Sequence, residues 1–388
     1  MTGAGGARRA DCGAAPCCGP PAAAASAAEA PRAPGRSDAP WSDGVVPTPI
    51  GGVPRARTSL SFRDRLGTLR ARLGAGRMRY RVAPGLYAVG DPGPRSTVLV
   101  SANYKMSFDA LRAALTGRDA WIMVLDTRGI NVWCAAGKGT FGTAEIVRRV
   151  RGTGLSQVVS HRTLVLPQLG APGVSAHLVR RRAGFRVVYG PVRAADLPAF
   201  LDSRMKATPE MRRVRFGLRD RAVLAPVEIV MGAKYALPAA AAFLALGGLG
   251  PRGYSLAGAG TTGLEGAALL IGSCLLGAAL GPALLPWLPG RAFALKGAVL
   301  GLAAVTAGVA AGRPLPFSDL SLHAAAWALL VPAITSFVLM NFTGSSTYTS
   351  LSGVLREMRF AVPAQAAAAA LGLALWLAGL FVGGGPAQ

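Results

Sequence analysis

Acidic residues are scarce in this 388-residue sequence: 18 Asp and Glu stand against 42 Lys and Arg, so the net charge is +24. Charged residues of all kinds make up only 15%, whereas hydrophobic residues make up 51% and the mean hydropathy is +0.38. This composition excludes an ordinary soluble protein and predicts membrane-spanning segments. Strongly basic proteins often bind nucleic acid or an anionic membrane. Because no nucleic-acid-binding motif accompanies the arginines, we expect a membrane-facing surface and no nucleic acid partner.

Cysteine is also scarce, and the five cysteines are Cys12, Cys17, Cys18, Cys134 and Cys274. Their spacing does not form two CxxC pairs, which argues against a zinc or iron–sulfur site within the chain. Because Cys134 and Cys274 fall in such different settings, a disulfide framework is disfavoured too. We therefore expect a reduced, cytoplasmic setting for the soluble part of the chain.

The pattern of residues divides the chain into three regions. Residues 1–56 are rich in Ala, Gly, Pro and Arg, which predicts a disordered, low-complexity tail. Residues 57–215 alternate between short apolar runs and helix-like stretches, which predicts an α/β domain with a doubly wound, parallel sheet. Strands are expected at 98–101, 121–125, 164–166 and 185–189, and helices at 105–115, 140–151, 174–182 and 194–206. Residues 216–388 are apolar and predict an all-α transmembrane domain of about five helices.

The five expected spans are 224–249, 264–286, 292–312, 323–343 and 361–383. Each is close to the ~20 residues that a helix needs to cross the hydrocarbon core. The loops on one side contain Arg291, Lys296, Arg356 and Arg359, and those on the other contain Arg252 and Arg313. Because basic loops favour the cytoplasmic side, we expect a multi-pass protein of the inner (cytoplasmic) membrane. Its soluble domain would be cytoplasmic and its C-terminus outside.

An unusual motif, NVWCAAGK, occupies residues 131–138, in the loop after the expected strand 121–125. In doubly wound sheets ligands bind beyond the carboxyl ends of the strands. The motif is not a phosphate-binding P-loop, because Val132 and Gly139 stand where that loop needs Gly and Ser or Thr. Small residues after Cys134 would let a flat ligand approach closely, and a thiolate is a soft donor to transition metals. The residues alone leave two interpretations open: a metal or redox role for Cys134, or a small thiol buried under Trp133.

Residues 129–143 resemble the cap-helix signature of the corrinoid protein of microbial mercury methylation (HgcA). Four further blocks resemble the same family, and the resemblance covers about residues 85–383; the blocks are 101–112, 166–174, 184–192 and 341–353. The family is related to the large subunit of the corrinoid iron–sulfur protein of acetyl-CoA synthesis, whose similar cap lacks the cysteine. The resemblance thus implies a Rossmann-like corrinoid-binding domain.

The resemblance also implies roles for particular residues. Cys134 would be the catalytic residue and the lower axial ligand to cobalt in a cobalamin-type corrinoid. The residues expected to bind the corrinoid with it are Ser101, Asn131, Val132, Trp133, Ala135, Ala136, Gly137 and Lys138. Ser101 stands where the family is expected to have Thr. We interpret the nearby acids Asp109, Asp126 and Glu145 as capping or solvated groups.

The activity that the resemblance implies is methyl transfer from cobalt to mercury(II), which gives methylmercury. A thiolate ligand donates electrons strongly, so it should favour departure of the methyl group with its bonding electrons. The Asp-x-His-x-x-Gly motif of His-ligated corrinoid proteins is absent, because Val159 and Ser175 precede His161 and His177. The implied partners are a small ferredoxin with two [4Fe–4S] clusters and a methyl-donor protein or methyltetrahydrofolate-linked methyltransferase. Two alternatives remain: a corrinoid methyl carrier for another acceptor in one-carbon or metalloid metabolism, and a membrane transporter with a regulatory domain.

Overall fold

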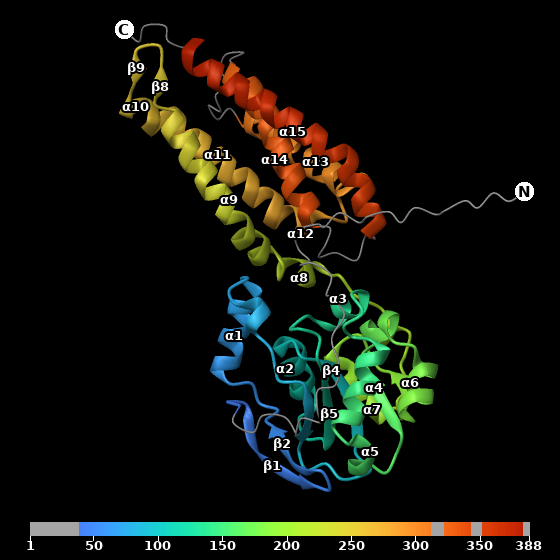
Figure 1. Ribbon diagram of the computed structural model, residues 1–388. Helices are drawn as coiled ribbons and strands as arrows, with labels where there is room; N and C mark the ends of the chain where they lie inside the picture. Colours follow the sequence, from blue (N-terminus) through green and yellow to red (C-terminus); the bar gives the residue numbers. More distant parts are fainter. Residues whose placement is uncertain (1–38, 312–321, 343–350, 383–388) are drawn as a thin grey trace, which may run out of the picture.

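The computed structural model describes residues 39–311, 322–342 and 351–382, which form an α/β unit joined to a bundle of long helices (Figure 1). The tail cysteines Cys12, Cys17 and Cys18 lie outside the described residues, as do Arg313 and most of the 341–353 block. The expected fold class, an α/β domain followed by apolar helices, is confirmed.

Seven strands form the sheet of the α/β unit in the order β1-β2-β3-β5-β4-β6-β7. Their bounds are β1 Ser42–Thr48, β2 Gly51–Ala56, β3 Gly85–Val89, β4 Thr97–Ala102, β5 Ala120–Leu125, β6 Thr163–Leu166 and β7 Arg186–Tyr189. The last four in sequence are mutually parallel, but β3 runs antiparallel to β5 and β1 antiparallel to β2. The four expected strands, β4 to β7, are therefore parallel as predicted. The sheet is mixed because of β1, β2 and β3, which were not expected.

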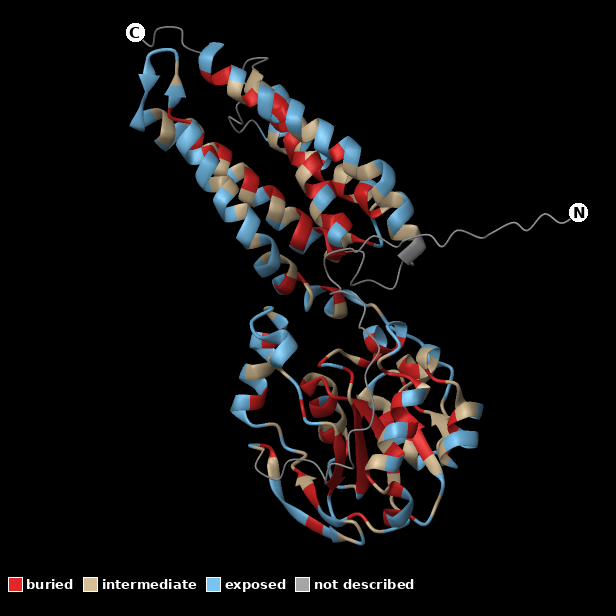
Figure 2. Ribbon diagram, in the orientation of Figure 1, coloured by how far each residue is buried: buried red, intermediate tan, exposed pale blue. Residues whose placement is uncertain are grey.

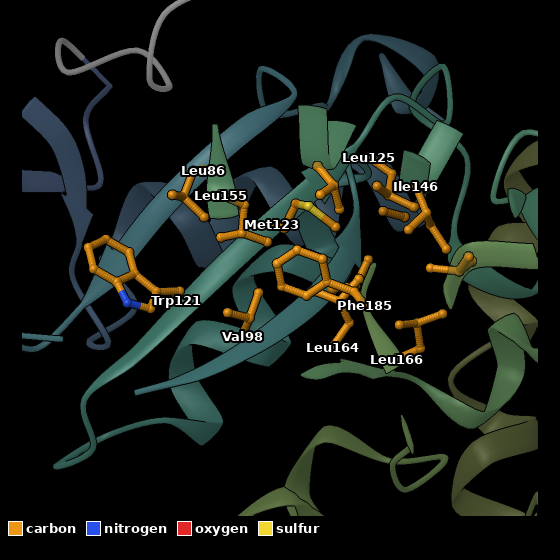
Figure 3. Close-up of a cluster of buried hydrophobic side chains, with 14 of the residues drawn as sticks. Leu86, Val98, Trp121, Met123, Leu125, Ile146, Leu155, Leu164, Leu166 and Phe185 are labelled. Atoms are coloured by element: carbon orange, nitrogen blue, oxygen red, sulfur yellow. The ribbon is translucent and has the colours of Figure 1, made fainter. Parts of the chain in front are cut away.

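Helices cover both faces of this sheet. The elements are α1 Phe62–Arg72, η1 Arg77–Arg79, α2 Lys105–Ala114, α3 Val132–Gly137, α4 Thr143–Gly152, α5 Leu155–Val158, η2 Gln168–Gly173, α6 Ala176–Ala183, η3 Ala194–Asp196, α7 Leu197–Asp202 and η4 Glu210–Arg212. On one face Ile146, Leu155 and Phe185 pack over Val98 and Met123 (Figure 3). On the other, side chains of α2 and α7 pack over the sheet through Phe108 and Phe200. The expected helix 194–206 is shorter than predicted and begins as a 3₁₀ turn.

Residues 42–56, which composition assigned to a disordered tail, instead form the hairpin β1–β2 at the sheet edge. Val46 and Val53 are buried in the main core, and β2 pairs with β3 through Arg55 and Ala88. Glycine and proline within these strands hid them from composition. Pro47 is tolerated in β1 because β1 is the edge strand of the sheet. The ordered unit therefore extends N-terminally of the expected boundary at residue 57.

The strand order creates a switch point between β4 and β6. From β4 the chain crosses through α2 to β5 on one side, and from β5 it crosses through α4 to β6 on the other side. The two crossovers lie on opposite faces of the sheet. In open α/β sheets such a reversal leaves a crevice at the carboxyl ends of the two strands, which is the usual ligand site.

In the described part of the chain, five helical segments are long and apolar enough to cross a membrane: Leu218–Leu246, Leu256–Leu284, Phe293–Ala310, Leu322–Asn341 and Gly353–Val382. They contain α8 Leu218–Ala222, α9 Ala225–Leu246, α11 Leu264–Leu275, α12 Gly281–Leu284, α13 Phe293–Ala310, α14 Leu322–Asn341 and α15 Leu351–Val382. Phe243, Trp327 and Trp376 form their central aromatic contact. The expectation of five apolar helices is confirmed, although α15 begins well before residue 361.

Two adjacent residues of α8 connect the α/β unit with the helix bundle. Asp220 accepts a hydrogen bond from Arg193, in the loop after β7, at 2.9 Å. Arg221 is buried and donates to the carbonyl oxygens of Pro282 and Ala283 at 3.1 and 3.0 Å. Neighbouring side chains of one helical turn thus bond to the two units: Asp220 to the α/β unit and Arg221 to the helix bundle.

Candidate functional site

The short helix α3 lies at the carboxyl edge of the sheet, directly after β5 and the loop 126–131. Asn131 caps it: the side-chain Oδ1 accepts a hydrogen bond from the Cys134 N–H at 2.9 Å. Asparagine is among the residues that best satisfy the free N–H groups of a first helical turn. The motif therefore lies at the edge where the strand order predicts a ligand site, and Asn131 fixes the orientation of Cys134.

The two faces of α3 differ sharply in burial (Figure 2). Val132, Ala135 and Ala136 are buried in the main core, whereas Cys134 is exposed and Trp133 is 45% exposed. The interpretation of Cys134 as a thiol buried under Trp133 is therefore wrong. Gly137 and Lys138 are exposed as well. A side chain with a soft sulfur atom is thus presented outward from a helix whose other face is fixed.

Glycines allow α3 to sit close to η2, the 3₁₀ turn that follows β6. A Cβ atom on Gly173 would collide with the carbonyl oxygen of Phe141 and lie 3.0 Å from the Cα of Ala136. A Cβ atom on Gly137, by contrast, would meet no atom within 4 Å. The inner side of α3 is therefore tightly packed and the Cys134 side is open.

These two glycines provide a matched pair of substitutions. Gly173→Ala is expected to destabilise the α/β unit by about 1–3 kcal/mol, because the new methyl group overpacks the contact with α3. Gly137→Ala is expected to leave stability unchanged or raise it by up to about 1 kcal/mol, since alanine is the better helix former. Thermal unfolding of the purified full chain measures both. Equal melting temperatures for the two variants would contradict the packing described here.

Asn103, immediately after β4, holds the loop that leads into α3. Its Oδ1 accepts from the N–H groups of Thr127 and Gly129 at 3.1 and 2.8 Å, and its Nδ2 donates to Asp126 at 3.2 Å. The loop needs this support because Arg128 and Gly129 have left-handed backbones, with φ of 59° and 76°. Sequence reasoning missed Asn103 as a site residue; the available signal was a polar amide directly after a strand at the switch point.

Asn103→Ala is expected to lower the unfolding free energy by about 1–3 kcal/mol, because buried N–H groups of the loop lose their acceptor. Hydrogen exchange of the amides at 127 and 129 should accelerate together with the loss of stability. Thr116→Ala, which removes an exposed hydroxyl, serves as the control and should change stability by less than about 0.5 kcal/mol. Unchanged exchange at both amides would argue against this role of Asn103.

The acids near the site have structural roles. Glu145 accepts a hydrogen bond from the Asp126 N–H at 2.9 Å and pairs with Arg149 at 2.8 Å. Asp126 accepts from Asn103 and from the Arg128 N–H. Asp109 is neither a cap nor solvated, since it lies in a buried ionic cluster. Among the residues that the structure describes, no three His, Cys, Asp or Glu side chains gather as a metal site.

Ser101 does not lie with the outward residues of α3. It is buried in β4, and its hydroxyl is 3.2 Å from the carbonyl oxygen of Ala102. Side chains alternate along a strand, and Val100 and Ala102 belong to the core beneath α3 whereas Leu99 belongs to the opposite core. Ser101 therefore faces α2 and α7, on the opposite side of the sheet from α3. The other expected site residues, 131–138, lie together on α3 and its two ends.

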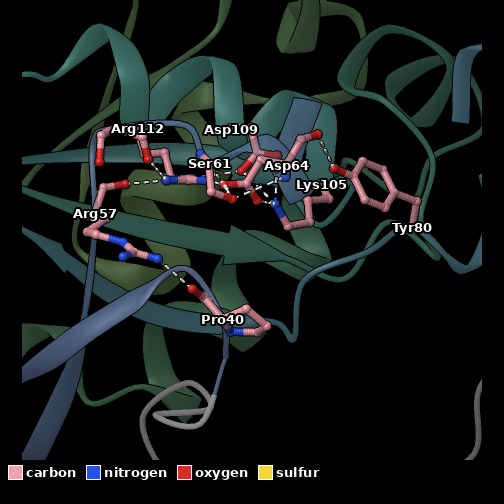
Figure 4. A network of polar contacts seen from close by, with 9 residues as sticks. Pro40, Arg57, Ser61, Asp64, Tyr80, Lys105, Asp109 and Arg112 are labelled. Atoms are coloured by element: carbon pink, nitrogen blue, oxygen red, sulfur yellow. Dashed lines mark hydrogen bonds and ion pairs between the residues drawn. The ribbon is translucent and has the colours of Figure 1, made fainter. Parts of the chain in front are cut away.

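A buried ionic cluster links α1 to α2 (Figure 4). Lys105 contacts Asp64 at 2.6 Å and Asp109 at 2.7 Å, and Arg112 contacts the same two carboxylates at 2.9 and 2.8 Å. Burial alone would raise the pKa of Asp64, but hydrogen bonds from Lys105 and Ser61 outweigh it and hold that pKa well below the usual range. Asp64 thus contributes stability throughout the neutral range, and this contribution is lost only as the pH falls through the lowered pKa.

The fold defines a class: an α/β domain with a mostly parallel sheet, joined to helices that can span a membrane. Residues 73–200 match the family model of the CO dehydrogenase/acetyl-CoA synthase delta subunit. The chain is also similar to acetyl-CoA decarbonylase/synthase complex subunit gamma from Methanopyrus kandleri and Archaeoglobus fulgidus. The identities are 35% and 30% over 124 residues, which cover 31% of this chain and 26% of each relative.

The matched region contains the parallel strands, α3 and its support loop. It leaves out the hairpin β1–β2, the whole of α1 and the five apolar helices. The chain spans about a quarter of the length of these relatives. The similarity therefore concerns the α/β unit and its site.

Proposed function

We propose that the α/β unit binds a cobalamin-type corrinoid on the outward face of α3 and acts as a methyltransferase that forms methylmercury from mercury(II). The observation that carries this proposal is the exposed Cys134 at the carboxyl edge of the sheet, held by the Asn131 cap. The similarity to acetyl-CoA decarbonylase/synthase subunits supports a corrinoid in this part of the chain. Cys134 would be the lower axial ligand to cobalt.

The residues of α3 suit such a group. Gly137 leaves open space beside Cys134, so a flat macrocycle could approach the helix backbone. Trp133 and Lys138 are exposed at the ends of this face, where they could border the ring. Three residues expected to touch the corrinoid, Val132, Ala135 and Ala136, are buried instead, so their role would be to support the helix from below.

A corrinoid, when bound, would supply the cobalt-carried methyl group. The protein's contribution would be the Cys134 thiolate, a soft and strongly electron-donating ligand, and the cap that orients it. Mercury(II), the substrate, is an electrophile that can accept a methyl group with its bonding electrons. Ordering of the loop 126–131 by Asn103 would keep the thiolate in place throughout the transfer.

The proposed setting follows from the apolar helices. They would anchor the chain in the cytoplasmic membrane with the α/β unit on the cytoplasmic side, as the loop charges suggest. A two-cluster ferredoxin would return electrons to the corrinoid, and a methyl-donor protein or a methyltetrahydrofolate-linked methyltransferase would remethylate it. These partners would reach the unit from the aqueous side.

A second candidate is a corrinoid methyl carrier for another acceptor. The similarity of residues 73–200 to subunits of the acetyl-CoA decarbonylase/synthase complex favours it. Purified full-length protein loaded with methylcobalamin and given mercury(II) distinguishes the two. We expect cobalt-dependent formation of methylmercury above the protein-free rate. Corrinoid binding without methylmercury would reject the first function and favour the second; no corrinoid binding would reject both.

A further inference from the structure

Helix α1 carries an exposed apolar stripe on the surface of the α/β unit. Phe62, Leu66 and Leu69 are 77%, 41% and 53% exposed, and they stand at positions i, i+4 and i+7 of one helix. Residues at this spacing share a face. Large apolar side chains aligned in this way mark a surface that contacts something other than water.

Arginines border the stripe on both sides. With 3.6 residues per turn, Arg63 and Arg70 fall on one flank and Arg65 and Arg72 on the other, and all four are exposed. The one acidic residue of α1 is Asp64, which is buried on the opposite face. An apolar face bordered by arginines is the pattern of a helix that lies in the interface of an anionic membrane.

The inner face of α1 is fixed, so the stripe cannot turn inward. Asp64 joins the buried ionic cluster with Lys105 and Arg112. Gly67 packs against the ring of Tyr80, where a Cβ atom would lie 2.6 Å from the nearest ring carbon. The Tyr80 hydroxyl donates to the Asp64 carbonyl oxygen at 3.1 Å. These contacts hold the apolar stripe on the outside of the unit.

The position of α1 identifies what covers the stripe. α1 and η1 lie at the end of the α/β unit nearest α8 and α9, whereas β1 lies at the opposite end (Figure 1). Met78, in η1, adds another exposed apolar side chain at this end. Because the same chain continues into helices able to cross a bilayer, lipid is the neighbouring apolar phase. Four arginines favour anionic headgroups over an uncharged protein surface.

We propose that α1 docks on the bilayer surface, with Phe62, Leu66 and Leu69 inserted at the headgroup boundary and the flanking arginines bound to anionic lipid. The contact gives the α/β unit a second membrane attachment besides the chain connection through α8. This docking is independent of the cofactor and of the reaction catalysed. It would orient the unit so that the edge carrying α3 stays close to the membrane.

The test uses the full-length chain with its five native cysteines replaced by serine and one new cysteine carrying an environment-sensitive fluorophore. The label is placed by Leu66→Cys, with Val45→Cys as the matched control, since Val45 is similarly exposed (46%) but lies in β1. Each protein is reconstituted into nanodiscs of phosphatidylglycerol and phosphatidylcholine. Part of the phosphatidylcholine carries a nitroxide near the top of the acyl chain, which quenches fluorophores in contact with lipid.

We expect strong quenching at position 66 and none at position 45. The quenching should fall when phosphatidylglycerol is omitted, and also in the variant that adds Arg65→Gln and Arg72→Gln. Equal quenching at both positions would overturn the proposal. A label at 66 that is shielded from water but unquenched by lipid would overturn it too, because a protein surface would then cover the stripe.

Discussion

Cys134→Ala is expected to abolish methylmercury formation while the protein remains folded. The thiol is exposed, and alanine keeps the backbone N–H that donates to Asn131. Such surface substitutions change stability by less than about 0.5 kcal/mol. Loss of the proposed axial ligand should also change the visible spectrum of a bound corrinoid. Methylmercury yield, thermal unfolding and the absorption spectrum measure the three effects on one sample.

Two further substitutions sharpen this test. Cys274→Ala removes the other cysteine that the structure describes, which is half-buried in α11, and should leave activity unchanged. Cys134→His offers a nitrogen donor of lower electron-donating power, so corrinoid binding is expected to persist with slower transfer. Full activity in Cys134→Ala would reject the assignment of the axial ligand.

Asp109→Ala is expected to destabilise the α/β unit by about 3–5 kcal/mol, because it leaves Lys105 and Arg112 buried with a single carboxylate. Arg112 is fully buried, and Lys105 is nearly so. Since the cluster also anchors α1, the N-terminal hairpin and α1 should become accessible to protease before the rest of the unit. Thermal unfolding and limited proteolysis of the full-length protein measure these effects.

An exposed ion pair provides the control for Asp109→Ala. Arg118 and Asp202 lie 2.7 Å apart, and the Asp202 side chain is 63% exposed. Asp202→Ala should therefore cost no more than about 1 kcal/mol. If Asp109→Ala and Asp202→Ala lowered the unfolding free energy by similar amounts, burial would not explain how much the Asp109 cluster stabilises the protein.

The parallel strands of the α/β unit were predictable because each is a short apolar run between turn residues, as in residues 121–125. The hairpin β1–β2 was not, because its glycines and prolines resemble a disordered tail and few of its hydrophobic side chains, Val46, Val53 and Ala56, belong to the two cores. Strand β3 was not expected either, although all five of its residues are buried. Its antiparallel direction appears only in its pairing with β5. Because β3 is buried on both faces, it reads as a continuous apolar run, the pattern typical of parallel strands.

The site was predictable where local sequence dictates it. Residues 131–134 contain their own cap, so the position of Cys134 in the first turn of the short helix follows from local sequence. Its exposure does not, because only the packing of Val132, Ala135 and Ala136 into the core turns Cys134 outward. Ser101 illustrates the limit, because its side chain direction depends on the register of β4 within the sheet. Asn103 was missed because its partners lie more than twenty residues away in the chain. Long-range hydrogen bonds of this kind leave no periodic signal in a sequence.

The two contacts of α8, one with the α/β unit and one with the helix bundle, should respond differently to salt. Arg193 and Asp220 are partly exposed, so mobile ions weaken their attraction, whose reach is about 8 Å at physiological ionic strength. Arg221 is withdrawn from water and is screened far less. Rising ionic strength therefore weakens the contact between Arg193 and Asp220 first, while Arg221 keeps α8 bonded to the helix bundle. Low ionic strength therefore favours the contact that holds the α/β unit against α8.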